Sequence, residues 1–432
     1  MTGVAATVTL TRFMFSMIYA MRGLSRAVVA LALAAILLPL ARPLAARAQT
    51  DAIDTETRGL WVTRSSMVSP ASIAAVVRTA RAQGFNTLLV QVRGRGDAYY
   101  QSKLEPRPAT LSKQPLTFDP LETALAEAHS AGLRVHAWVN ANLVADAEPS
   151  PLPDHLVYTH PEWLMVPRDL AVDLWDVNPR SDEYLAALSR YARAHADRIE
   201  GLYASPLQPA AAQHTLKVIA DIAERYAIDG LHLDYIRFPS VDFDYSPRAI
   251  AQFRQYVQPR LSGAERRQYD ARAKNEPLFY TQMLPQRWQE FRQEQLTDLV
   301  TRVRSAVKAR RPAAVVSAAV FPDANEAATR RLQDWEGWVR DGLLDVVCPM
   351  AYTTDPALFR SQISKVRRLA GEKPVWAGIG AFQLSSLETV LNIRAARELG
   401  VQGVILFSYD NLVGSNTSGD YLSTVGHDAF DE

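Results

Sequence analysis

The segment DGLHLDYIRFP, from Asp229 to Pro239, reads as a β-strand with an acidic side chain inside an apolar run. Successive side chains of a strand point to opposite faces, so His232 and Asp234 share one face, while the leucines beside them and Tyr235 share the other. The apolar face suits a covering layer of helices, and the opposite face then points to the interior of a parallel sheet. A carboxylate is stable in such a place only when it is paired, ligated or open to a site.

The rest of the chain alternates short β-rich runs with longer helical patterns. Eight strands are predicted, over residues 59–62, 87–92, 134–140, 230–236, 315–321, 345–352, 375–381 and 403–410. Helices are predicted over residues 72–83, 120–131, 214–226, 287–310, 356–369 and 386–399. Strands that alternate with helices form βαβ units and a parallel sheet, and eight such units favour a closed (β/α)8 TIM barrel of the α/β class.

An open, doubly wound sheet is the alternative architecture. No G-x-G-x-x-G motif follows the first strand and no Walker A lysine is present, so a nucleotide site has no support. Two connections are far longer than usual: residues 141–209 after the third strand, with a further helical pattern over 183–198, and residues 240–285 after the fourth. Both follow the carboxyl ends of strands, where barrels place their binding loops, and both are predicted to wall a cleft.

Composition excludes several classes of protein. Hydrophobic residues make up 48% of the 432 residues and charged residues 22%, which indicates a globular protein with a large core. Lys and Arg number 47 against 46 Asp and Glu, so no overall charge attracts nucleic acid or an anionic membrane. The single cysteine, Cys348, has no partner for a disulfide within the chain, and its apolar surroundings predict a small buried side chain rather than a nucleophile.

The first 48 residues are predicted to be a secretory signal peptide. Arg22 and Arg26 precede the apolar run 27–38, and the sequence A-R-A that ends at Ala48 matches a cleavage site. A permanent membrane anchor is the alternative, but the apolar run is short for a bilayer. The mature chain, residues 49–432, is therefore expected to be a single exported barrel domain in the periplasm or outside the cell.

Several blocks of the sequence resemble, in order, the bacterial glycosyl-hydrolase-like 10 family of exported (β/α)8 proteins. The blocks are GLWVT, FNTLLVQVRGRGDAYYQSKLEPRPATL, DPLETALAEAHSAGLRVHAWVN and YAIDGLHLDYIRFP, and the resemblance spans roughly residues 57–410. It implies a glycoside hydrolase that acts on bacterial polysaccharide, with peptidoglycan glycan strands as the expected substrate. The chain departs from the family where GLYASPLQPAAAQ lacks an Asp/Asn-Pro-Gly turn, and where residues 145–199 form an enlarged insertion.

Hydrolysis of a glycosidic bond needs two carboxyl groups, one protonated beside the leaving oxygen and one ionised as nucleophile or base. Asp234 is the predicted principal carboxylate, and the alternative is a structural ion pair with Arg237 or another arginine. Glu105, in the block SKLEP, is the predicted acid/base partner because it matches the family block and the proline after it keeps its backbone extended. Burial beside Leu104 would raise its pKa towards that of a general acid, and the alternative is a solvated loop residue. Other carboxyls near predicted strand ends are Asp97, Asp323, Asp410 and two reserve catalytic candidates, Glu326 and Asp355.

Polar and aromatic side chains near the predicted strand ends are candidate substrate-binding groups. Arg93 follows the second strand. It is predicted to orient a substrate oxygen or to lower the pKa of Asp234, and the alternative is a salt bridge at the strand end. Asn140 ends the third strand and offers a donor and an acceptor to sugar hydroxyls, or else caps the next loop. Aromatic side chains there stack on sugars or fill the core. The full set of substrate-binding candidates is Arg93, Tyr99, His136, Trp138, Asn140, His232, Arg237, Tyr352, Trp376 and Asp410.

No metal or cofactor site is predicted. The H-E-x-x-H and G-x-S-x-G motifs are absent, and four histidines lack the spacing of metal ligands: His136, His155, His160 and His232. The sequence therefore predicts a cofactor-independent hydrolase whose partner is a glycan strand or other polysaccharide, with no nucleic acid and no stable membrane anchor. The alternative is a catalytically silent barrel that binds polysaccharide or a cell-envelope partner.

Overall fold

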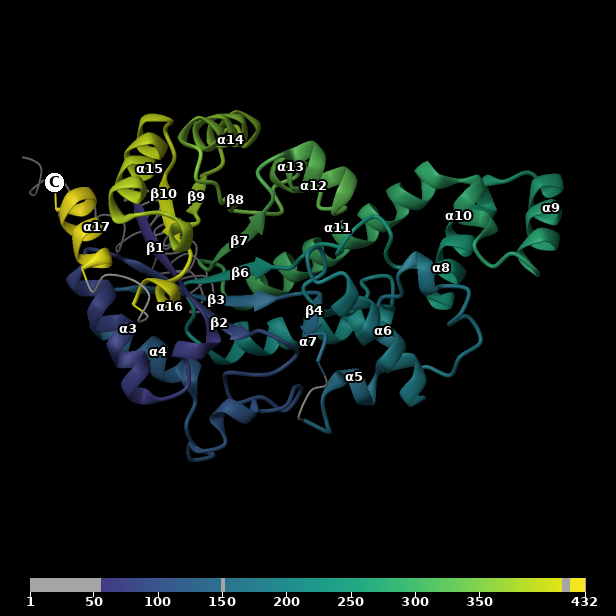
Figure 1. Cartoon of the computed structure of the whole chain (residues 1–432), viewed down its shortest axis with the longest axis horizontal. Coiled ribbons are helices and arrows are strands. Elements are labelled where there is room, and N and C mark those ends of the chain that lie inside the picture. The colour runs from purple at the N-terminus through teal and green to yellow at the C-terminus, as the bar shows by residue number, and fades with distance from the viewer. Residues whose placement is uncertain (1–55, 149–151, 414–419, 432) are drawn as a thin grey trace, which may run out of the picture. The chain divides into compact units, whose positions relative to one another are not determined.

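Eight parallel strands close into a barrel in the computed structural model, which describes residues 56–148, 152–413 and 420–431 (Figure 1). The strands are β1 (Thr57–Val62), β2 (Thr87–Arg93), β3 (Arg134–Asn140), β6 (Gly230–Asp234), β7 (Val315–Val320), β8 (Val346–Ala351), β9 (Trp376–Ile379) and β10 (Gly403–Leu406). Around the barrel they are ordered β1, β10, β9, β8, β7, β6, β3 and β2, with β2 closing on β1. The predicted (β/α)8 barrel is confirmed.

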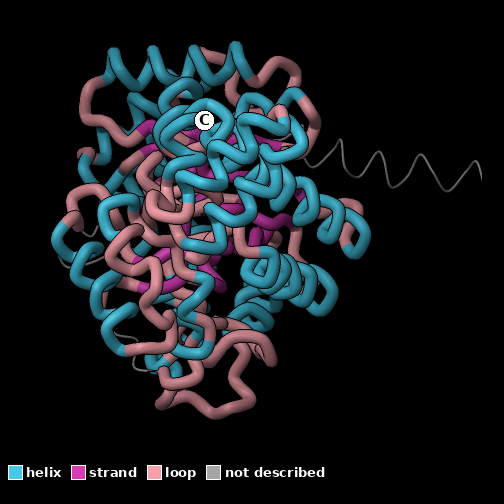
Figure 2. Tube along the Cα trace, turned by 90° about the vertical axis from the view of Figure 1, so that its right-hand side faces the viewer, coloured by secondary structure: helices cyan, strands magenta, loops and turns pink. Residues whose placement is uncertain are grey.

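Helices cover the outside of this barrel, and Figure 2 shows them in cyan around the magenta strands. The longer helices after barrel strands are α3 (Pro70–Ala82), α4 (Pro120–Ser130), α7 (Pro209–Arg225), α11 (Pro285–Arg310), α14 (Pro356–Leu369) and α15 (Ser386–Glu398). The shorter ones are α12 (Ala324–Arg330), α13 (Trp335–Arg340), α16 (Tyr409–Leu412) and α17 (Tyr421–Phe430). Ser69 and Asp119 cap α3 and α4 through side-chain oxygens, and a proline at the first helical position fixes each start.

The two faces of β6 separate as the alternation of side chains predicts. Leu231 and Leu233 are buried in the large core that also contains helix side chains, whereas His232 lies inside the barrel. There Trp61 Nε1 donates to His232 Nε2 at 3.1 Å, and His232 Nδ1 lies 2.9 Å from Ser317 Oγ. The other side chains of the interior are largely apolar, and they include Leu89, Trp138, Val346, Cys348, Trp376 and Ile405. The barrel is thus a packed core, and Cys348 is a buried part of it.

The connection between β3 and α7 builds a small substructure at the carboxyl ends of β3 and β6. It contains an antiparallel pair, β4 (Leu143–Ala145) and β5 (Leu202–Tyr203), and the helices α5 (Leu156–Thr159) and α6 (Asp182–Ala194). The helix predicted over residues 183–198 is α6, which ends earlier. The sequence does not predict β4 and β5, because strands of two or three residues are too short to show an alternating pattern.

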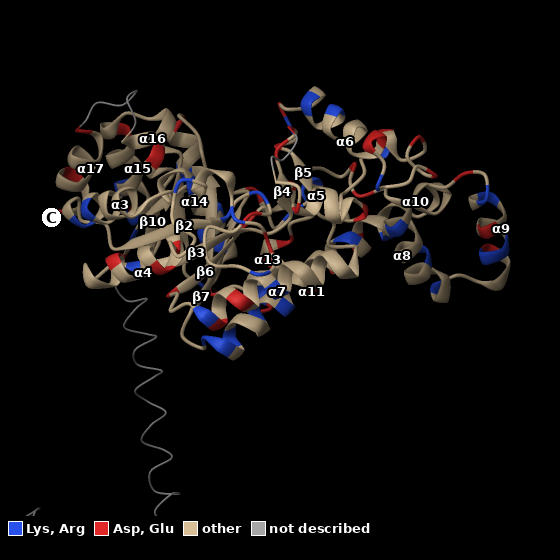
Figure 3. Ribbon diagram, turned by 90° about the horizontal axis from the view of Figure 1, so that it is seen from below, with Lys and Arg blue, Asp and Glu red and all other residues tan. Residues whose placement is uncertain are grey.

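The connection between β6 and α11, which is predicted to wall a cleft and for which no helix is predicted, contains helices. It forms three helices, α8 (Pro247–Val257), α9 (Gly263–Ala273) and α10 (Phe279–Met283), which project from the barrel beside α11 (Figure 1). Helix α8 has a serine cap followed by proline and a helical spacing of buried apolar residues, and α9 has a capping box. Figure 3 shows both signs of charge on α9, whose residues all remain at least partly exposed.

The predicted signal peptide, residues 1–48, lies outside the described residues. By its internal contacts, the chain from Glu56 onward is one compact unit. Across residues 56–148, 152–413 and 420–431, no helix combines the length and the apolar character that crossing a bilayer would require.

Candidate active site

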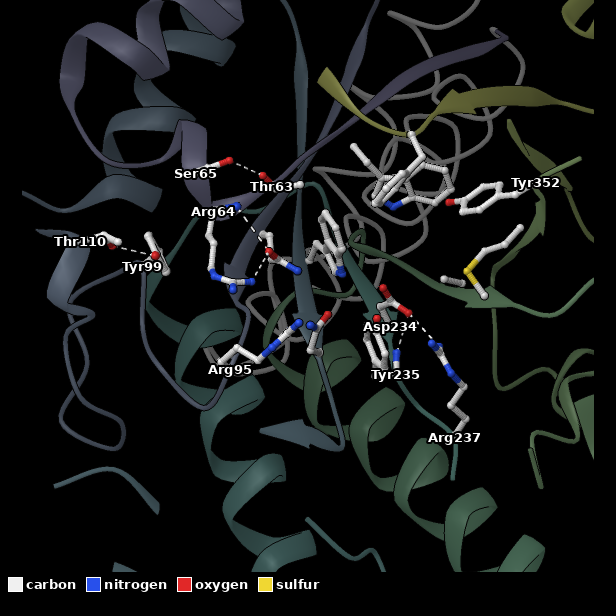
Figure 4. A pocket seen from close by; sticks show the side chains of 17 residues that line it. Thr63, Arg64, Ser65, Arg95, Tyr99, Thr110, Asp234, Tyr235, Arg237 and Tyr352 are labelled. Carbon is white, nitrogen blue, oxygen red and sulfur yellow. Dashed lines mark hydrogen bonds and ion pairs between the residues drawn. The ribbon is translucent and has the colours of Figure 1, made fainter. Parts of the chain in front are cut away.

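A pocket of about 450 Å³ opens at the carboxyl ends of the barrel strands (Figure 4). This is the end of a (β/α)8 barrel at which active sites are built. The lining combines charged, polar and aromatic side chains: Trp61, Thr63, Arg64, Ser65, Gln91, Arg95, Tyr99, Thr110, Trp138, Asn140, Asp234, Tyr235, Arg237, Ala319, Met350, Tyr352 and Phe407. Six strands, β1, β2, β3, β6, β7 and β8, contribute side chains to this one hollow, together with the turns that follow them and Phe407 directly after β10.

Asp234 ends β6 and lines this pocket, as its place in the sequence predicts. Its Oδ1 accepts a hydrogen bond from the Tyr235 backbone N–H at 2.6 Å and from Arg237 Nη1 at 3.1 Å. Its Oδ2 accepts no hydrogen bond from any described residue, and the residue keeps 7% of its surface exposed. The predicted alternative of an arginine pair is thus present together with the pocket, and one oxygen stays available to a ligand.

Tyr235 corrects the predicted facing of side chains. The alternation places it on the helix side, but its φ of 49° is in the left-handed region and β6 ends before it, so its side chain lines the pocket. A bulky residue rarely adopts this conformation, and such outliers concentrate at functional sites. The turn directs the Tyr235 N–H to Asp234 and fixes the carboxylate.

Arg237 lies between two carboxylates. Its Nη1 binds Asp234, and its Nη2 lies 3.6 Å from Oε1 of Glu200, which is two positions before β5. The guanidinium also stacks over the Tyr235 ring, with 4.0 Å from Cζ to the ring centroid. Burial alone would lower the pKa of Arg237, but the charge of Asp234 raises it above its usual value. Sequence reasoning missed Glu200, because no motif or strand end marks it.

Glu105 does not lie in the pocket, and its environment contradicts the predicted role of general acid. Arg93 donates to both of its oxygens, with Nε to Oε2 at 2.8 Å and Nη2 to Oε1 at 2.6 Å, and His214 Nε2 lies 3.1 Å from Oε1. Burial would raise the pKa of Glu105, yet the Arg93 charge and the His214 hydrogen bond hold it at about 2. The carboxylate stays ionised, so it has no proton to give.

Arg93 therefore forms a salt bridge, which was the predicted alternative to a substrate contact. Its Nη1 donates to the backbone oxygens of Asn140 at 2.5 Å and Ala141 at 3.0 Å, and none of its surface is exposed. These bonds tie the end of β2 to the end of β3. Arg93 therefore holds the ends of β2 and β3 together and does not line the pocket.

Four predicted substrate-binding residues line the pocket with Asp234 and Arg237: Tyr99, Trp138, Asn140 and Tyr352. Two of their polar atoms, Trp138 Nε1 and Asn140 Oδ1, have no hydrogen-bond partner within the described chain. Burial raises the pKa of Tyr99 and that of Tyr352, so both hydroxyls remain protonated. The aromatic faces of the lining suit the C–H surfaces of a ligand, whereas the unpaired atoms of Trp138 and Asn140 are themselves buried.

Three other predicted binding residues lie outside the pocket lining. His136 and His232 are buried in the barrel, and Trp376 packs against His136 with 5.3 Å between ring centroids. Burial lowers the pKa of His136 to about 4 and that of His232 to about 3, so both rings are neutral near pH 7. The prediction that these residues contact substrate is not supported, because core side chains cover them.

Three of the remaining carboxyl candidates, Asp410, Asp355 and Asp323, bind groups of the protein itself. Asp410 accepts from the Thr63 N–H at 2.7 Å and from two serine hydroxyls, and it holds the turn after β1. Asp355 caps α14, and Asp323 caps α12 while pairing with Lys365. The reserve candidates Glu326 and Asp355 are exposed and absent from the lining. Asp97 borders a neighbouring hollow.

The sequence also missed the polar residues that follow β1 and β2. Thr63, Arg64 and Ser65 come directly after β1, and Arg95 comes two residues after β2. Their position past a strand end is the signal that could have identified them, as it did Asn140. Over the described ranges, no group of three or more His, Cys, Asp or Glu is arranged to hold a metal ion.

This fold and this pocket define the class of the protein. A closed (β/α)8 barrel with a carboxylate in an aromatic and polar pocket at the strand ends is an architecture of glycoside hydrolases. Residues 56–379 match the model of the Glycosyl hydrolase-like 10 family, and the chain belongs to this family. The resemblance seen in the sequence blocks is thereby confirmed.

Two curated relatives are named glycosyl hydrolases. Glycosyl hydrolase YngK of Bacillus subtilis (strain 168) is 21% identical over 345 residues, which cover 72% of this chain and 56% of the relative. Glycosyl hydrolase DigH of Escherichia coli (strain K12) is 26% identical over 210 residues, or 43% of each chain. The chain thus spans about half the length of the relatives that it matches.

Solved structures share the fold at low sequence identity. The PgaB (BpsB) glycoside hydrolase domain of Bordetella bronchiseptica has a TM-score of 0.60 at 14% identity, covering 87% of this chain and 99% of that one. A beta-galactosidase from Bacillus circulans sp. alkalophilus also has a TM-score of 0.60, at 12% identity, covering 87% and 56%. These similarities support the barrel architecture.

Proposed function

We propose that this protein is an exported glycoside hydrolase that cleaves a bacterial polysaccharide, with peptidoglycan glycan strands as its substrate. One observation carries the proposal: Asp234 presents a carboxylate oxygen that no described residue binds, in a sugar-compatible pocket at the strand ends. Membership of the Glycosyl hydrolase-like 10 family and the names of the two relatives support the reaction class. Export rests on the predicted signal peptide.

The mechanism that we propose uses two carboxylates, Asp234 and Glu200. Arg237 Nη1 lies 3.1 Å from Asp234 Oδ1 and Nη2 lies 3.6 Å from Glu200 Oε1, so both carboxyls border one guanidinium. Glu200 is not among the lining residues of the pocket, and it would act from its edge. The Glu200 side chain is 35% exposed, whereas that of Glu105 is 1% exposed. Asp234 is held by two donors and acts as the ionised member of the pair.

A polysaccharide-binding barrel without catalysis is the second candidate. It is favoured by one observation: among the described lining residues, Asp234 is the sole carboxylate, and it is paired with Arg237. In that case the pocket would hold a glycan but leave its bonds intact.

The test separates the two candidates with one set of proteins. Purified residues 49–432 are incubated with bacterial polysaccharides, including peptide-free murein glycan, and products are measured by mass spectrometry. We expect cleavage by the native chain, loss of cleavage with retained glycan binding in Asp234→Asn, and a strong decrease in Glu200→Gln. The control is Glu224→Gln, which removes a surface ion pair with Arg310 on the outer helices and should leave activity unchanged.

Binding without cleavage by the native chain would establish the second candidate. Native-like cleavage by folded Asp234→Asn would remove the proposed mechanism. If Glu200→Gln alone retains full activity, Asp234 works with a different partner.

A further inference from the structure

An aromatic wall leads from the interior of the barrel to its rim, and it consists of Trp61, Tyr352, Phe407 and Phe382. Trp61 lies on β1, and Tyr352 and Phe407 come directly after β8 and β10. These three rings line the pocket. Phe382, in the turn after β9, does not, but its ring centroid lies 6.1 Å from that of Tyr352 and 6.1 Å from that of Phe407. The wall therefore continues past the edge of the pocket.

Exposure to solvent increases outward along the aromatic wall. Trp61 is 1% exposed, Tyr352 and Phe407 are partly exposed, and Phe382 is 48% exposed. The planes of the Tyr352 and Phe407 rings make angles of 85° and 78° with that of Phe382, so neither ring lies flat against it. A single exposed apolar side chain is ordinary on a protein surface. Phe382 differs because it is the outer end of a cluster that lines a ligand pocket, where a bound ligand can reach it.

The backbone holds Phe382 in this position. The residue belongs to the 3₁₀ turn η6 (Ala381–Gln383), and its N–H donates to the Phe407 carbonyl oxygen at 3.3 Å. The Tyr421 hydroxyl donates to the Ala381 carbonyl oxygen at 3.1 Å, which ties the turn to α17. A ring on an ordered turn loses little conformational freedom when a ligand covers it.

The aromatic wall begins next to the carboxylate of Asp234. Asp234 and Tyr352 line the same pocket, and burial and then the charge of Asp234 raise the pKa of the Tyr352 hydroxyl. Figure 4 shows Tyr352 and Tyr99 at opposite sides of the hollow. A chain that is bound at Asp234 and extends past Tyr352 reaches Phe382 next.

We infer that Phe382 is a sugar-stacking platform that forms a further subsite beside the pocket, so that the glycan chain extends over η6. The inference rests on the proposed function and adds a specificity-determining residue to the same site. The face of an aromatic ring carries partial negative charge, and it attracts the C–H groups on the face of a sugar ring. Phe382 lies beyond residues 56–379, which match the family model, so family membership by itself does not predict this subsite.

The first experiment measures how cleavage depends on the length of the glycan. Peptide-free murein glycan strands are fractionated by length and incubated with the native chain and with Phe382→Ala. We expect Phe382→Ala to raise KM for long strands about tenfold and to leave kcat within about twofold, because the ring binds a sugar away from the bond that breaks. The increase in KM should become smaller as the strands become too short to reach η6.

The second experiment separates a ring face from apolar packing. Phe382→Tyr and Phe382→Trp keep an aromatic face and should keep the native KM, whereas Phe382→Leu, which keeps only an apolar side chain, should behave as Phe382→Ala does. The matched control is Leu387→Ala, which truncates an apolar side chain on α15 that is 61% exposed and does not line the pocket, and it should keep the native KM. Thermal unfolding confirms that each variant is folded.

The third experiment measures binding without cleavage. Phe382→Trp is combined with Asp234→Asn, and tryptophan emission is followed as long murein strands are added. We expect a shift to shorter wavelength that exceeds the shift in Asp234→Asn alone, because a stacked sugar removes water from the new ring. This measurement depends neither on hydrolysis nor on the stability of Phe382→Ala.

The outcomes separate the inference from the proposed function. A native KM in Phe382→Ala, an increase that is the same for all strand lengths, or an emission that bound glycan leaves unchanged overturns the platform and leaves the hydrolase standing. A native chain that cleaves no glycan, together with the expected shift in emission, overturns the hydrolase and supports the platform. A chain that neither cleaves nor binds glycan overturns both.

Discussion

Two arginine–carboxylate pairs lie at the strand ends, Arg93–Glu105 and Arg237–Asp234. They have the same kinds of charged group, and they differ in how many oxygens of the carboxylate accept hydrogen bonds from the protein. In the first pair, arginine binds both oxygens of Glu105, His214 adds a further contact, and the side chain is 1% exposed. In the second, both contacts fall on one oxygen of Asp234, and the residue lines the pocket.

This difference separates a structural ion pair from a functional one. A carboxylate whose oxygens are both bound stabilises the fold and is unavailable to a substrate. A carboxylate held through one oxygen is oriented by the protein, and its other oxygen can act on a ligand. The number of donors at each oxygen, rather than the presence of an arginine, decides the role.

The largest expected effect is on activity at the second pair. Asp234→Asn keeps an acceptor for the Tyr235 N–H but removes the charge, so glycan cleavage should decrease by about 10²- to 10⁴-fold. Its free energy of unfolding should change far less than in the corresponding change at Glu105. Rates on a cleaved glycan and urea unfolding of the same preparation check both statements. A variant that loses stability instead of activity would show that Asp234 is structural.

We expect Glu105→Gln to lower the free energy of unfolding more than Asp234→Asn does. Removing one member of a fully buried pair leaves Arg93 charged and uncompensated, so the free energy of unfolding should decrease by about 3–5 kcal/mol. Urea unfolding at neutral pH measures this change. Glu326→Gln, an exposed residue on α12, is the control and should stay within about 0.5 kcal/mol of the native chain. Loss of activity in Glu105→Gln without loss of stability would restore a catalytic role for Glu105.

Acid should weaken the same buried pair. The pKa of Glu105 is about 2 in the folded chain against 4.5 as the ordinary value, so its stabilisation is complete above pH 4.5 and is lost as the pH falls towards 2. The buried neutral His232, whose pKa is about 3 against 6.5, adds a loss of stability that begins below pH 6.5. Urea midpoints across this range should show a smaller loss between pH 4.5 and 2 in Glu105→Gln. Parallel curves would contradict the assignment.

The smallest expected effect comes from the cation of the second pair. Arg237→Gln removes the group that orients Asp234 and Glu200, so kcat/KM should decrease by about tenfold to a hundredfold, and Arg237→Lys should recover part of it. Steady-state kinetics measure the change. An effect as large as that of Asp234→Asn would mean that Arg237 itself takes part in the reaction.

The sequence predicts most of the fold because its signals are local. Each predicted strand is present, since an apolar run bounded by helix ends needs no distant information, and Gly84 and Gly132 adopt the positive φ of 74° that a helix C-cap requires. The helices α8 to α10 were not predicted, although the serine cap and the helical spacing of apolar residues in α8 and the capping box of α9 are local signals that could have identified them.

The site is predicted only in part, because it depends on pairings between distant segments. Asp234, Asn140 and Trp138 follow from the alternation along a strand, and all three line the pocket. Glu105 has the residue type and position of a catalytic acid, but Arg93 and His214, the latter 109 positions along the chain, turn it into a buried ion pair. Nothing near Glu200 in the sequence indicates its contact with Arg237.

The sequence by itself determined the barrel, the family and the inward carboxylate of Asp234, because alternation and helix caps act over a few neighbouring residues. Only the tertiary structure decided which charges are satisfied. Whether a carboxylate or a guanidinium is neutralised depends on side chains that the closure of the barrel brings together. For this reason Glu105 is buried and paired, and Asp234 keeps one oxygen without a hydrogen bond from any described residue. For the same reason Arg64 has no ion-pair partner among the described residues.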